Sequence, residues 1–409
     1  MSSIAPALLR PIRRQSYRAA VGSPVNSVPR PYDAPQAHAP GENPDRVLVF
    51  GNGPAVGWGV ITQELALPGQ LARALAARTG RGCDVDLLAD TAWDMESSTE
   101  HLVGRDLAGY DAVVVVIGQS DAYRFLPERR WTAALVSLLD HLEASTSPAT
   151  GITVMGISPL SAVPPFHSRP GGSSDRWAQR LNELSLAICE GRPRAHFVDA
   201  PAAVGPLPGQ VLPSRDDHRY RSPQRFFEWA KTIAAHVAPY LDAQSAEDRP
   251  ARVARNRPQS PERRRAALWE LRLVDTPREK RFDDIVRRAQ QMFGTLGAAF
   301  SVIDENRQWN KSIVGYDVTE GLLRNSFCNT TIQHAGPFVV GDARCDERFE
   351  EMDTPVRFYA GYPVEAGDGT RIGALCVFDE QPRDPATVDL SLLRDFALAI
   401  QKELSAVTA

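Results

Sequence analysis

The feature that most constrains this chain is a break in hydrophobic periodicity near its middle. Residues 244–265 carry three prolines and seven arginines in place of an apolar pattern, and such a segment does not form a packed element. We therefore expect a linker over residues 244–263 between two folded blocks, residues 45–243 and 264–409. Residues 1–44 contain eight prolines and few large apolar side chains, so we expect a disordered tail there.

Composition excludes several classes of protein. With 46 Lys and Arg against 50 Asp and Glu, the formal net charge is −4, which gives no electrostatic footprint for nucleic acid. The five cysteines include no Cys-x-x-Cys pair, so we expect no disulfide framework or zinc ribbon, and a reducing cytoplasm as the location. No apolar run approaches the ~20 residues that cross a bilayer. Arg10, Arg13, Arg14 and Arg18 interrupt the N-terminal apolar stretch, which argues against a secretory signal.

The first block alternates β-branched runs with helical patterns. Buried parallel strands are predicted over residues 46–50, 84–89, 111–117, 152–157 and 195–198, because these largely apolar runs are bounded by turn residues. Helices are predicted over residues 68–78, 131–142, 174–189 and 222–241. This alternation predicts an α/β fold with a doubly wound, mainly parallel sheet, whose sites lie at the carboxyl ends of the strands.

Glycine and polar residues follow two of these strands. The first strand runs into Gly51-Asn52-Gly53 with Gly57 and Gly59 beyond, the third into Gly118-Gln119-Ser120-Asp121, and Asp216-Asp217-His218 precedes the last helix. This order resembles the SGNH (GDSL) hydrolase family over residues 45–243. The resemblance implies an ester hydrolase whose first motif carries the nucleophilic serine and whose last motif pairs an aspartate with a histidine.

The chain departs from that family at three of its signature positions. Gly53 stands where the family has its serine, and glycine has no side chain that attacks a carbonyl. Ser120 stands at the asparagine position, and Arg215 stands where the family has the aspartate three residues before His218. These departures predict a degenerate active site.

Two arrangements would still support hydrolysis. Ser120 and His218, oriented by Asp216 or Asp217, would form a displaced nucleophile and base. Alternatively, His218 and Asp121 would activate water as a general base without a covalent intermediate. In the interpretation without catalysis, His218 is a surface loop histidine.

The glycine-rich turn has a second interpretation. Asn52, Gly53 and Gly118 would line a pocket in which backbone N–H groups bind an anion or a carbonyl without turning it over. No Gly-x-Gly-x-x-Gly follows the strand at the place that nucleotide binding requires. We therefore predict a ligand-binding role for these three residues, with the ligand left open.

From residue 264 the pattern changes to helix, antiparallel strands and helix. Helices are predicted over residues 264–273 and 277–293, the latter with Thr276 as its N-cap, and strands over residues 298–304, 308–314, 356–364 and 371–379. Asp368-Gly369 between the last two strands is a strong hairpin signal. A final helix is predicted to open at Asp384-Pro385. The pattern predicts an α+β domain with an antiparallel sheet.

Six ordered segments of this block carry a family signature. They are ALWELRLVDTPREKRFDDIVRRA (267–289), IDENRQWNKSIVG (303–315), SFCNTTI (326–332), VVGDARCDERF (339–349), RFYAGYPV (357–364) and IGALCVFD (372–379). They resemble the GAF domain of the bacterial sensory type. The resemblance implies a small-molecule sensing or dimerising module with a pocket between the sheet and residues 326–332. It leaves the ligand open, because GAF domains bind cyclic nucleotides, tetrapyrroles, haem and other molecules.

Cys328 lies beside that implied pocket. A thiol there would attach a bilin or sense redox state, whereas the alternative is a buried small hydrophobe, since no Cys-His pair follows it. Cys376 lies inside a predicted strand and is expected in the core. His334 has no second histidine or carboxylate at a ligating spacing, so we predict no metal and leave the cofactor unknown.

Together these patterns predict a bacterial, cytoplasmic sensory or regulatory protein. Its GAF domain would bind a small molecule, and its α/β domain would be a pseudoenzyme that binds a ligand or a protein partner. The alternative is a GAF-regulated acyl esterase of the SGNH type that uses His218 with a displaced nucleophile. A third interpretation is a homodimer formed through the last helix, residues 387–404.

Overall fold

The computed structural model divides the chain into two compact units, Met1–Arg252 and Val253–Ala409. The structure describes residues 30, 31, 33, 35–41, 43–160, 172–201, 223–244, 259–350 and 352–405, together with residues 12, 13, 15 and 250. Each unit has its own sheet and its own hydrophobic core. The two units are described separately below.

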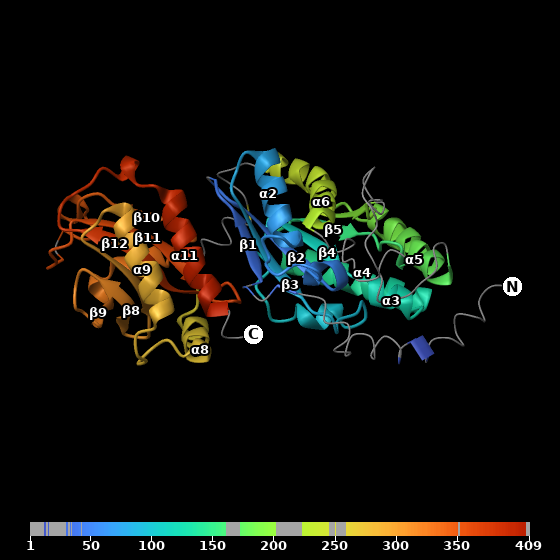
Figure 1. The fold of residues 1–409 in the computed structure, drawn as a ribbon, viewed down its shortest axis with the longest axis horizontal. Coiled ribbons are helices and arrows are strands. Elements are labelled where there is room, and N and C mark those ends of the chain that lie inside the picture. The colour runs from blue at the N-terminus through green and yellow to red at the C-terminus, as the bar shows by residue number, and fades with distance from the viewer. Residues whose placement is uncertain are drawn as a thin grey trace, which may run out of the picture. The chain divides into compact units, whose positions relative to one another are not determined.

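A six-stranded sheet forms the centre of the first unit (Figure 1). Its strands are β1 (Gln36–Ala39), β2 (Asp45–Gly51), β3 (Cys83–Ala89), β4 (Ala112–Val116), β5 (Gly151–Met155) and β6 (Ala195–Val198). They lie in the order β1-β3-β2-β4-β5-β6. All neighbours pair in parallel except β1, which pairs antiparallel with β3. This order confirms the doubly wound, mainly parallel sheet, because the chain runs outward from β2 in both directions.

Helices cover both faces of this sheet. On one face lie α2 (Leu67–Thr79) and α6 (Pro223–Ala243), and on the other α3 (Gln119–Tyr123), α4 (Glu128–Ser145) and α5 (Ser173–Glu190), with short 3-10 turns η2 (Gly53–Val56) and η3 (Ser98–His101) between elements. Alternation along β2 decides the faces. Val47 and Val49 pack with α2 and α6, whereas Leu48 and Phe50 pack with α4 and α5. The sheet is therefore buried on both sides, as its continuous apolar strands require.

The sequence predicted most elements of this unit within a few residues, with two corrections. The strand expected to end at residue 157 stops at Met155. More importantly, β1 lies inside residues 1–44, where a disordered tail was expected, and for these four residues that prediction is wrong. Its small and polar residues show no apolar run, so the pairing with β3 that orders it comes from tertiary structure.

The second unit is built on an antiparallel six-stranded sheet. Its strands are β7 (Gly297–Ile303), β8 (Arg307–Val314), β9 (Glu320–Leu322), β10 (Phe338–Val340), β11 (Phe358–Glu365) and β12 (Arg371–Asp379). They lie in the order β10-β11-β12-β7-β8-β9. The turn between β11 and β12 contains Gly369 with φ +80°, which only glycine adopts readily. The expected α+β arrangement is confirmed.

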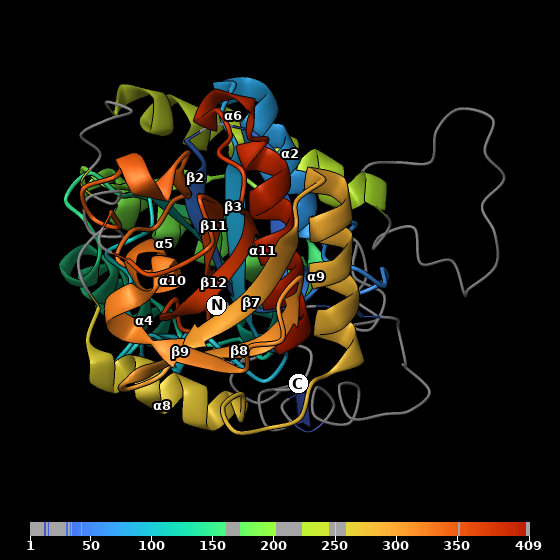
Figure 2. The same ribbon diagram turned by 90° about the vertical axis from the view of Figure 1, so that its left-hand side faces the viewer.

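Long helices lie on one face of this sheet, and a short helix lies on the other. The first set is α8 (Pro261–Leu271), α9 (Lys280–Phe293) and α11 (Leu390–Ser405), and the short helix is α10 (Phe327–Thr331), with 3-10 turns η7 (Leu323–Asn325), η8 (Ala343–Cys345) and η9 (Pro385–Thr387). Figure 2 shows α9 and α11 side by side along the sheet. Phe300 of β7 packs on this face with the long helices, and the adjacent residue, Ala299, packs on the opposite face with α10.

The first and last helices of this unit start at residues that differ from the sequence prediction. Ser260 caps α8, its side chain accepting from Arg263 N–H, so the helix begins inside the predicted linker of residues 244–263. Residues 245–249 and 251–258 of that linker lie outside the described residues. The final helix was expected from Asp384, but Asp384 caps only η9, and α11 begins at Leu390. Capping signals here mark short turns as readily as helices.

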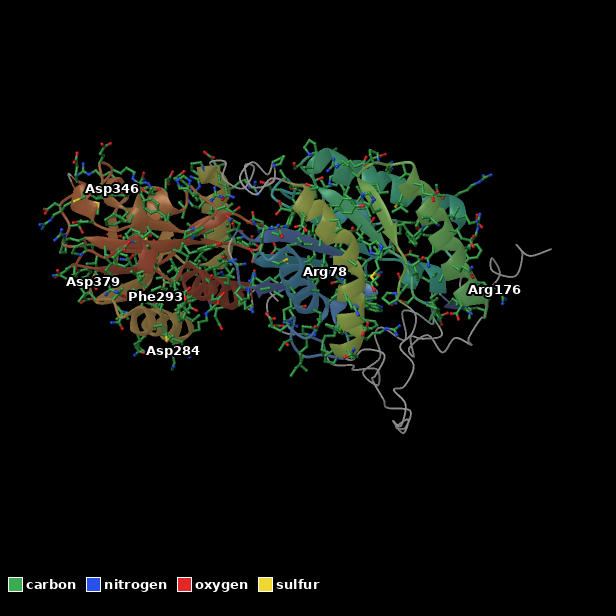
Figure 3. All side chains as sticks on the ribbon, turned by 90° about the horizontal axis from the view of Figure 1, so that it is seen from above. Arg78, Arg176, Asp284, Phe293, Asp346 and Asp379 are labelled. Atoms are coloured by element: carbon green, nitrogen blue, oxygen red, sulfur yellow. The ribbon has the colours of Figure 1, made fainter. Side chains whose placement is uncertain are left out.

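Arg383 joins the end of α9 to the end of β12. Its guanidinium donates to the Asp379 carboxylate over 2.6 Å and to the carbonyls of Phe293 and Gly294 over 2.9 Å and 2.6 Å. Figure 3 labels two of these anchors, Asp379 and Phe293. A positive charge at the carboxyl end of a helix satisfies carbonyls that have no partner within the helix.

Lys311 of β8 is fully buried and fixes where α9 begins. Its Nζ donates to Thr276 Oγ1 over 2.6 Å and to the Pro277 carbonyl over 2.7 Å, and it pairs with Glu279 Oε1 at 2.8 Å. The Thr276 hydroxyl in turn donates to the Leu273 carbonyl. Thr276 is therefore not the N-cap that the sequence indicated, and the helix starts only at Lys280.

Replacing Lys311 by methionine tests this anchor. Lys311→Met keeps the length of the side chain but removes the shared donor of the oxygens of Thr276, Pro277 and Glu279. We therefore expect the second unit to lose about 2–3 kcal/mol of unfolding free energy. Urea unfolding followed by far-ultraviolet circular dichroism measures it. Lys280→Met is the matched control, because that side chain is 86% exposed. A similar loss in both variants would contradict the anchor.

Candidate functional site

The candidate site of the first unit forms where β2 and β4 end side by side. Gly51, the last residue of β2, pairs with Val116, the last residue of β4. A Cβ on Gly51 would lie 1.9 Å from the Val116 carbonyl oxygen, so only glycine fits there. The next residue, Asn52, donates its backbone N–H to the same carbonyl over 2.8 Å. The two strand ends are thereby held in direct contact.

Three buried polar side chains meet at this point. The Asn52 amide donates to the Trp93 carbonyl over 2.6 Å and lies 3.2 Å from Ser120 Oγ. Ser120 Oγ lies 3.5 Å from Asp121 Oδ2, which also accepts from the Met95 N–H over 3.3 Å. Ser120 is 2% exposed, and Asn52 and Asp121 are buried as well. The strand ends thus assemble a continuous hydrogen-bonded polar cluster.

Burial dominates the electrostatics of Asp121. Loss of solvent raises the pKa of its carboxyl to about 7, although Arg124, whose guanidinium lies 3.2 Å from Asp121 Oδ1, acts in the opposite direction. Arg124 also donates to Asp94 over 3.0 Å. Burial raises the pKa of Asp94, but hydrogen bonds from Arg124 and the Ser97 N–H outweigh it, and the net pKa is lowered. One arginine therefore bridges two carboxyl groups of different acidity.

Two further features point into the cluster. Asn52 Oδ1 is buried and accepts no hydrogen bond from any described residue. Gly53, at φ +57°, faces Gln119, whose Oε1 lies 2.8 Å from where a Cβ at position 53 would stand. The amide side chain of Gln119 therefore lies beside position 53. Next to it, Asn52 Oδ1 can still accept a hydrogen bond.

The structure brings five predicted site residues together and leaves two outside the described residues. Asn52, Gly53, Gly118, Ser120 and Asp121 all lie at the joined ends of β2 and β4, with Gly118 preceding α3. Asp217 and His218 fall in residues 202–222, outside the described residues. No role for either is tested by this geometry.

Sequence reasoning missed three contributors to this cluster. Gln119 lies between Gly118 and Ser120, which were both predicted as site residues. Its position in the sequence could therefore have indicated that it lies at the site. Arg124 lies four residues after Ser120, one helical turn along the chain, so its reach to Asp121 could have been anticipated. Asp94 gave no signal, because it reaches the cluster from a loop after β3.

In the second unit, Cys328 lies where the GAF resemblance placed a pocket. The space between the sheet and α10 is filled by buried rings of Phe327, Phe338, Phe349 and Tyr359, with Phe327 stacked on Tyr359 at 4.9 Å. Cys328 is buried among them. A ligand at this place would have to displace side chains that are already packed.

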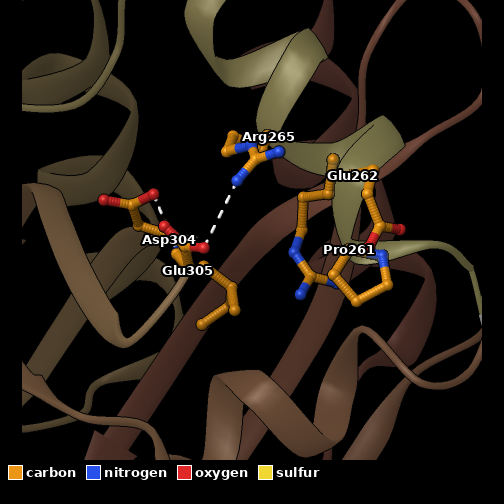
Figure 4. A pocket seen from close by; sticks show the side chains of 7 residues that line it. Pro261, Glu262, Arg265, Asp304 and Glu305 are labelled. Atoms are coloured by element: carbon orange, nitrogen blue, oxygen red, sulfur yellow. Dashed lines mark hydrogen bonds and ion pairs between the residues drawn. The ribbon is translucent and has the colours of Figure 1, made fainter.

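A small pocket opens elsewhere on this unit, between α8 and the end of β7 (Figure 4). Its lining consists of Pro261, Glu262, Arg264, Arg265, Ile303, Asp304 and Glu305. Arg265 Nη1 pairs with Glu305 Oε1 at 3.3 Å across it. An exposed ion pair of this kind contributes little binding energy, so we assign this pocket no role.

The described residues hold neither a membrane-spanning helix nor a metal-binding cluster. None of the described helices combines the length and the apolar content that a bilayer span requires. Nowhere in the described part of the chain do three or more His, Cys, Asp or Glu side chains gather closely enough to hold a metal ion.

The raised pKa of Asp121 predicts how stability depends on pH. Between the unfolded value, 3.8, and the folded value, about 7, the folded chain holds a proton that the unfolded chain has released. Stability then falls as pH rises, by up to about 1.4 kcal/mol per pH unit, and levels off above pH 7. Asp121→Asn should remove this part of the slope when urea unfolding is compared at pH 5, 6, 7 and 8.

Asp94→Asn is the matched control with the opposite sign. Because the folded pKa of Asp94 is lowered, its contribution is present at neutral pH and is lost as pH falls through that pKa. The Asp94→Asn variant should therefore differ from the wild type most at pH 7 and least in acid. If Asp121→Asn and the wild type share one slope from pH 5 to 7, the assigned pKa of Asp121 is wrong.

Comparisons with known proteins match both units. A cyclic di-GMP phosphodiesterase from Pseudomonas aeruginosa is 33% identical over 153 residues, which are 36% of this chain and 26% of that protein. This chain therefore spans about a quarter of the length of that relative. A solved GAF domain from an Acinetobacter phosphoenolpyruvate-protein phosphotransferase is 17% identical, over 36% of this chain and 92% of its own, with a TM-score of 0.26.

The N-terminal region is similar to solved structures of a different kind. A structure of TesA is 16% identical, over 48% of this chain and 100% of its own, with a TM-score of 0.36. A lipase from a goat rumen metagenome is 12% identical, over 48% of this chain and 98% of its own, with the same TM-score. The GAF domain model matches residues 277–404, which contain the antiparallel sheet, α9, α10 and nearly all of α11. Residues 277–404 of this chain are therefore similar to the GAF domain family.

Proposed function

We propose that this chain is a sensory or regulatory protein whose α/β unit binds a ligand or a protein partner without covalent catalysis. In this proposal the GAF domain supplies the sensing function and binds a small molecule. The α/β unit serves as a scaffold that presents the polar cluster of Asn52, Ser120 and Asp121. The proposal treats the unit as a pseudoenzyme with a hydrolase-like site.

One observation carries this proposal, the glycine at position 53. A covalent acyl intermediate needs a nucleophilic side chain, and glycine has none. Gln119 Oε1 lies beside the place that such a side chain would occupy. Ser120, the neighbouring hydroxyl, is buried and already hydrogen-bonded to Asn52. Each of these contacts supports binding over nucleophilic attack.

Asn52 Oδ1 has no hydrogen-bond donor among the described residues, and this supports a binding role. A buried acceptor without a donor costs about 1–3 kcal/mol, and a ligand with an N–H or O–H group would recover that energy. Asp121, with a pKa near 7, would adapt by holding or releasing a proton. A small polar molecule that carries a hydrogen-bond donor fits these groups best.

A signalling role and a cytoplasmic location have separate support. The relative from Pseudomonas aeruginosa carries a similar region within a cyclic di-GMP phosphodiesterase, which favours a bacterial signalling context for the GAF domain. The five cysteines are scattered along the sequence without a Cys-x-x-Cys pair, which favours a reducing compartment.

An esterase assay tests the proposal. The full chain, His218→Ala, Ser120→Ala and Gly53→Ser are compared on short-chain and medium-chain nitrophenyl esters. We expect ester hydrolysis in the presence of each of the four proteins to be no faster than in buffer alone. Gly53→Ser should also be inactive, because it restores a hydroxyl without the asparagine and aspartate that accompany the serine in SGNH hydrolases. Thermal unfolding by circular dichroism confirms that each variant is folded.

The alternative is acyl hydrolysis with Ser120 as a displaced nucleophile. The raised pKa of Asp121, 3.5 Å from Ser120 Oγ, is the observation that favours it, since a base that titrates near neutrality suits proton transfer. A turnover in the wild type that falls by about 10²-fold or more in His218→Ala or Ser120→Ala would establish this alternative and overturn the scaffold.

A further inference from the structure

Two cysteines that are 48 residues apart in the sequence meet in the core of the GAF domain. Cys328 lies on α10 and Cys376 on β12, and their sulfur atoms are 3.8 Å apart. Both thiols are buried, at 2% and 3% exposure. A disulfide has a sulfur–sulfur distance of about 2.05 Å. The two sulfurs, now 3.8 Å apart, therefore need to approach each other by about 1.75 Å to form one.

Hydroxyl groups make the two thiols unequal. The Tyr359 hydroxyl donates to Cys328 Sγ over 3.4 Å and lies 2.8 Å from Thr331 Oγ1. The contact with the Cys376 sulfur lowers the pKa of Cys328, while burial opposes this change and the hydrogen bond with Tyr359 adds to it. The same contact with Cys328 raises the pKa of Cys376, as does burial. Cys328 is therefore the sulfur that forms a thiolate first.

Cys189 and Cys345 differ from this pair in their surroundings and serve as internal references. Cys189 is buried, and burial raises its pKa to about 11, so it is a poor nucleophile. Cys345 is exposed and lies 3.7 Å from a carboxylate oxygen of Asp342. A reagent that discriminates by accessibility alone would therefore modify Cys345 and spare Cys328.

We propose that Cys328 and Cys376 form a peroxide-oxidised dithiol, which makes the GAF domain a site of reversible disulfide formation. The Cys328 thiolate attacks one oxygen of hydrogen peroxide, the O–O bond breaks, and water leaves after protonation, giving a sulfenic acid. The Cys376 sulfur then attacks the Cys328 sulfur, the S–O bond breaks, and its thiol proton leaves with the hydroxide as water. Two thiols lose two electrons in total, and one peroxide becomes two waters.

Helix α10 determines both how peroxide reaches Cys328 and what the disulfide would change. Access requires α10 to open locally. This helix is only five residues long, and hydrogen peroxide is little larger than water. The disulfide would tie α10 to β12 and remove the thiolate that accepts from Tyr359. This inference goes beyond the proposed function, and it stands whether or not the α/β unit hydrolyses esters.

Peptide mapping of the full chain tests the proposal. The reduced protein is treated with hydrogen peroxide under native conditions, quenched with catalase, alkylated in denaturant and digested with trypsin. Cys328 falls on residues 325–344, Cys376 on residues 372–383 and Cys345 alone on residues 345–348. We expect a cross-link between the first two peptides that thiol reductant removes, with Cys189 fully alkylated.

Variants separate this mechanism from adventitious oxidation. Cys345→Ser should leave the cross-link unchanged, whereas Cys376→Ser should abolish it and leave a dimedone-reactive sulfenic acid at Cys328. Tyr359→Phe should move the pH profile of Cys328 oxidation to higher pH, because the hydroxyl that stabilises the thiolate is gone. Because Tyr359→Phe removes only one hydroxyl group, we expect this variant to fold. It therefore tests the proposal even if Cys376→Ser fails to fold.

Two results would overturn the proposal. In one, peroxide oxidises Cys345 while Cys328 and Cys376 stay alkylatable in the wild type. In the other, the same cross-link forms as fast in urea-unfolded protein as in the native chain, which would show that the folded geometry does not direct it.

Discussion

The contact between Gly51 and the Val116 carbonyl is the constraint on which the α/β site depends. Backbone hydrogen bonds hold neighbouring strands about 4.8 Å apart, and a Cβ normally points out of the plane of the sheet. At Gly51, where φ is +145°, a Cβ would point at the Val116 carbonyl instead. Here the missing Cβ lets β2 and β4 close directly, and Asn52 then turns its amide toward Ser120. The cluster exists because one residue is small, and its polar groups are buried because the two strands meet.

Burial gives the two units a common chemistry. Asp121 in the first unit and the pair of Cys328 and Cys376 in the second are ionisable groups that lie out of solvent beside hydrogen-bond donors. Such groups are expensive for folding, and Lys311 shows how the chain offsets the expense when the role is structural, by giving its Nζ three oxygen partners. A binding or chemical role is worth seeking for groups such as Asn52 Oδ1, which has no donor within the described part of the chain.

The sequence anticipated what depends on local pattern. Continuous apolar runs located β2, β4 and β6, and their order placed Asn52, Ser120 and Asp121 at one edge. Long-range partners were not accessible in this way. The period of a strand shows that Cys376 faces inward, but only the fold shows that it faces Cys328. Likewise, Thr276 before Pro277 has the form of a helix cap, and the buried Lys311 that engages it comes from a strand 35 residues away.

The small strand β1 has a practical consequence for the outer boundary of the α/β unit. It covers the outer edge of β3 through antiparallel pairing, and the Pro35 carbonyl adds a hydrogen bond from Leu87 N–H. A chain shortened to begin at residue 45 would keep every apolar strand of the core and yet leave the backbone donors and acceptors of β3 unpaired at the surface. Open edges of this kind template intermolecular strand addition, so solubility, rather than core stability, would be the first property to suffer.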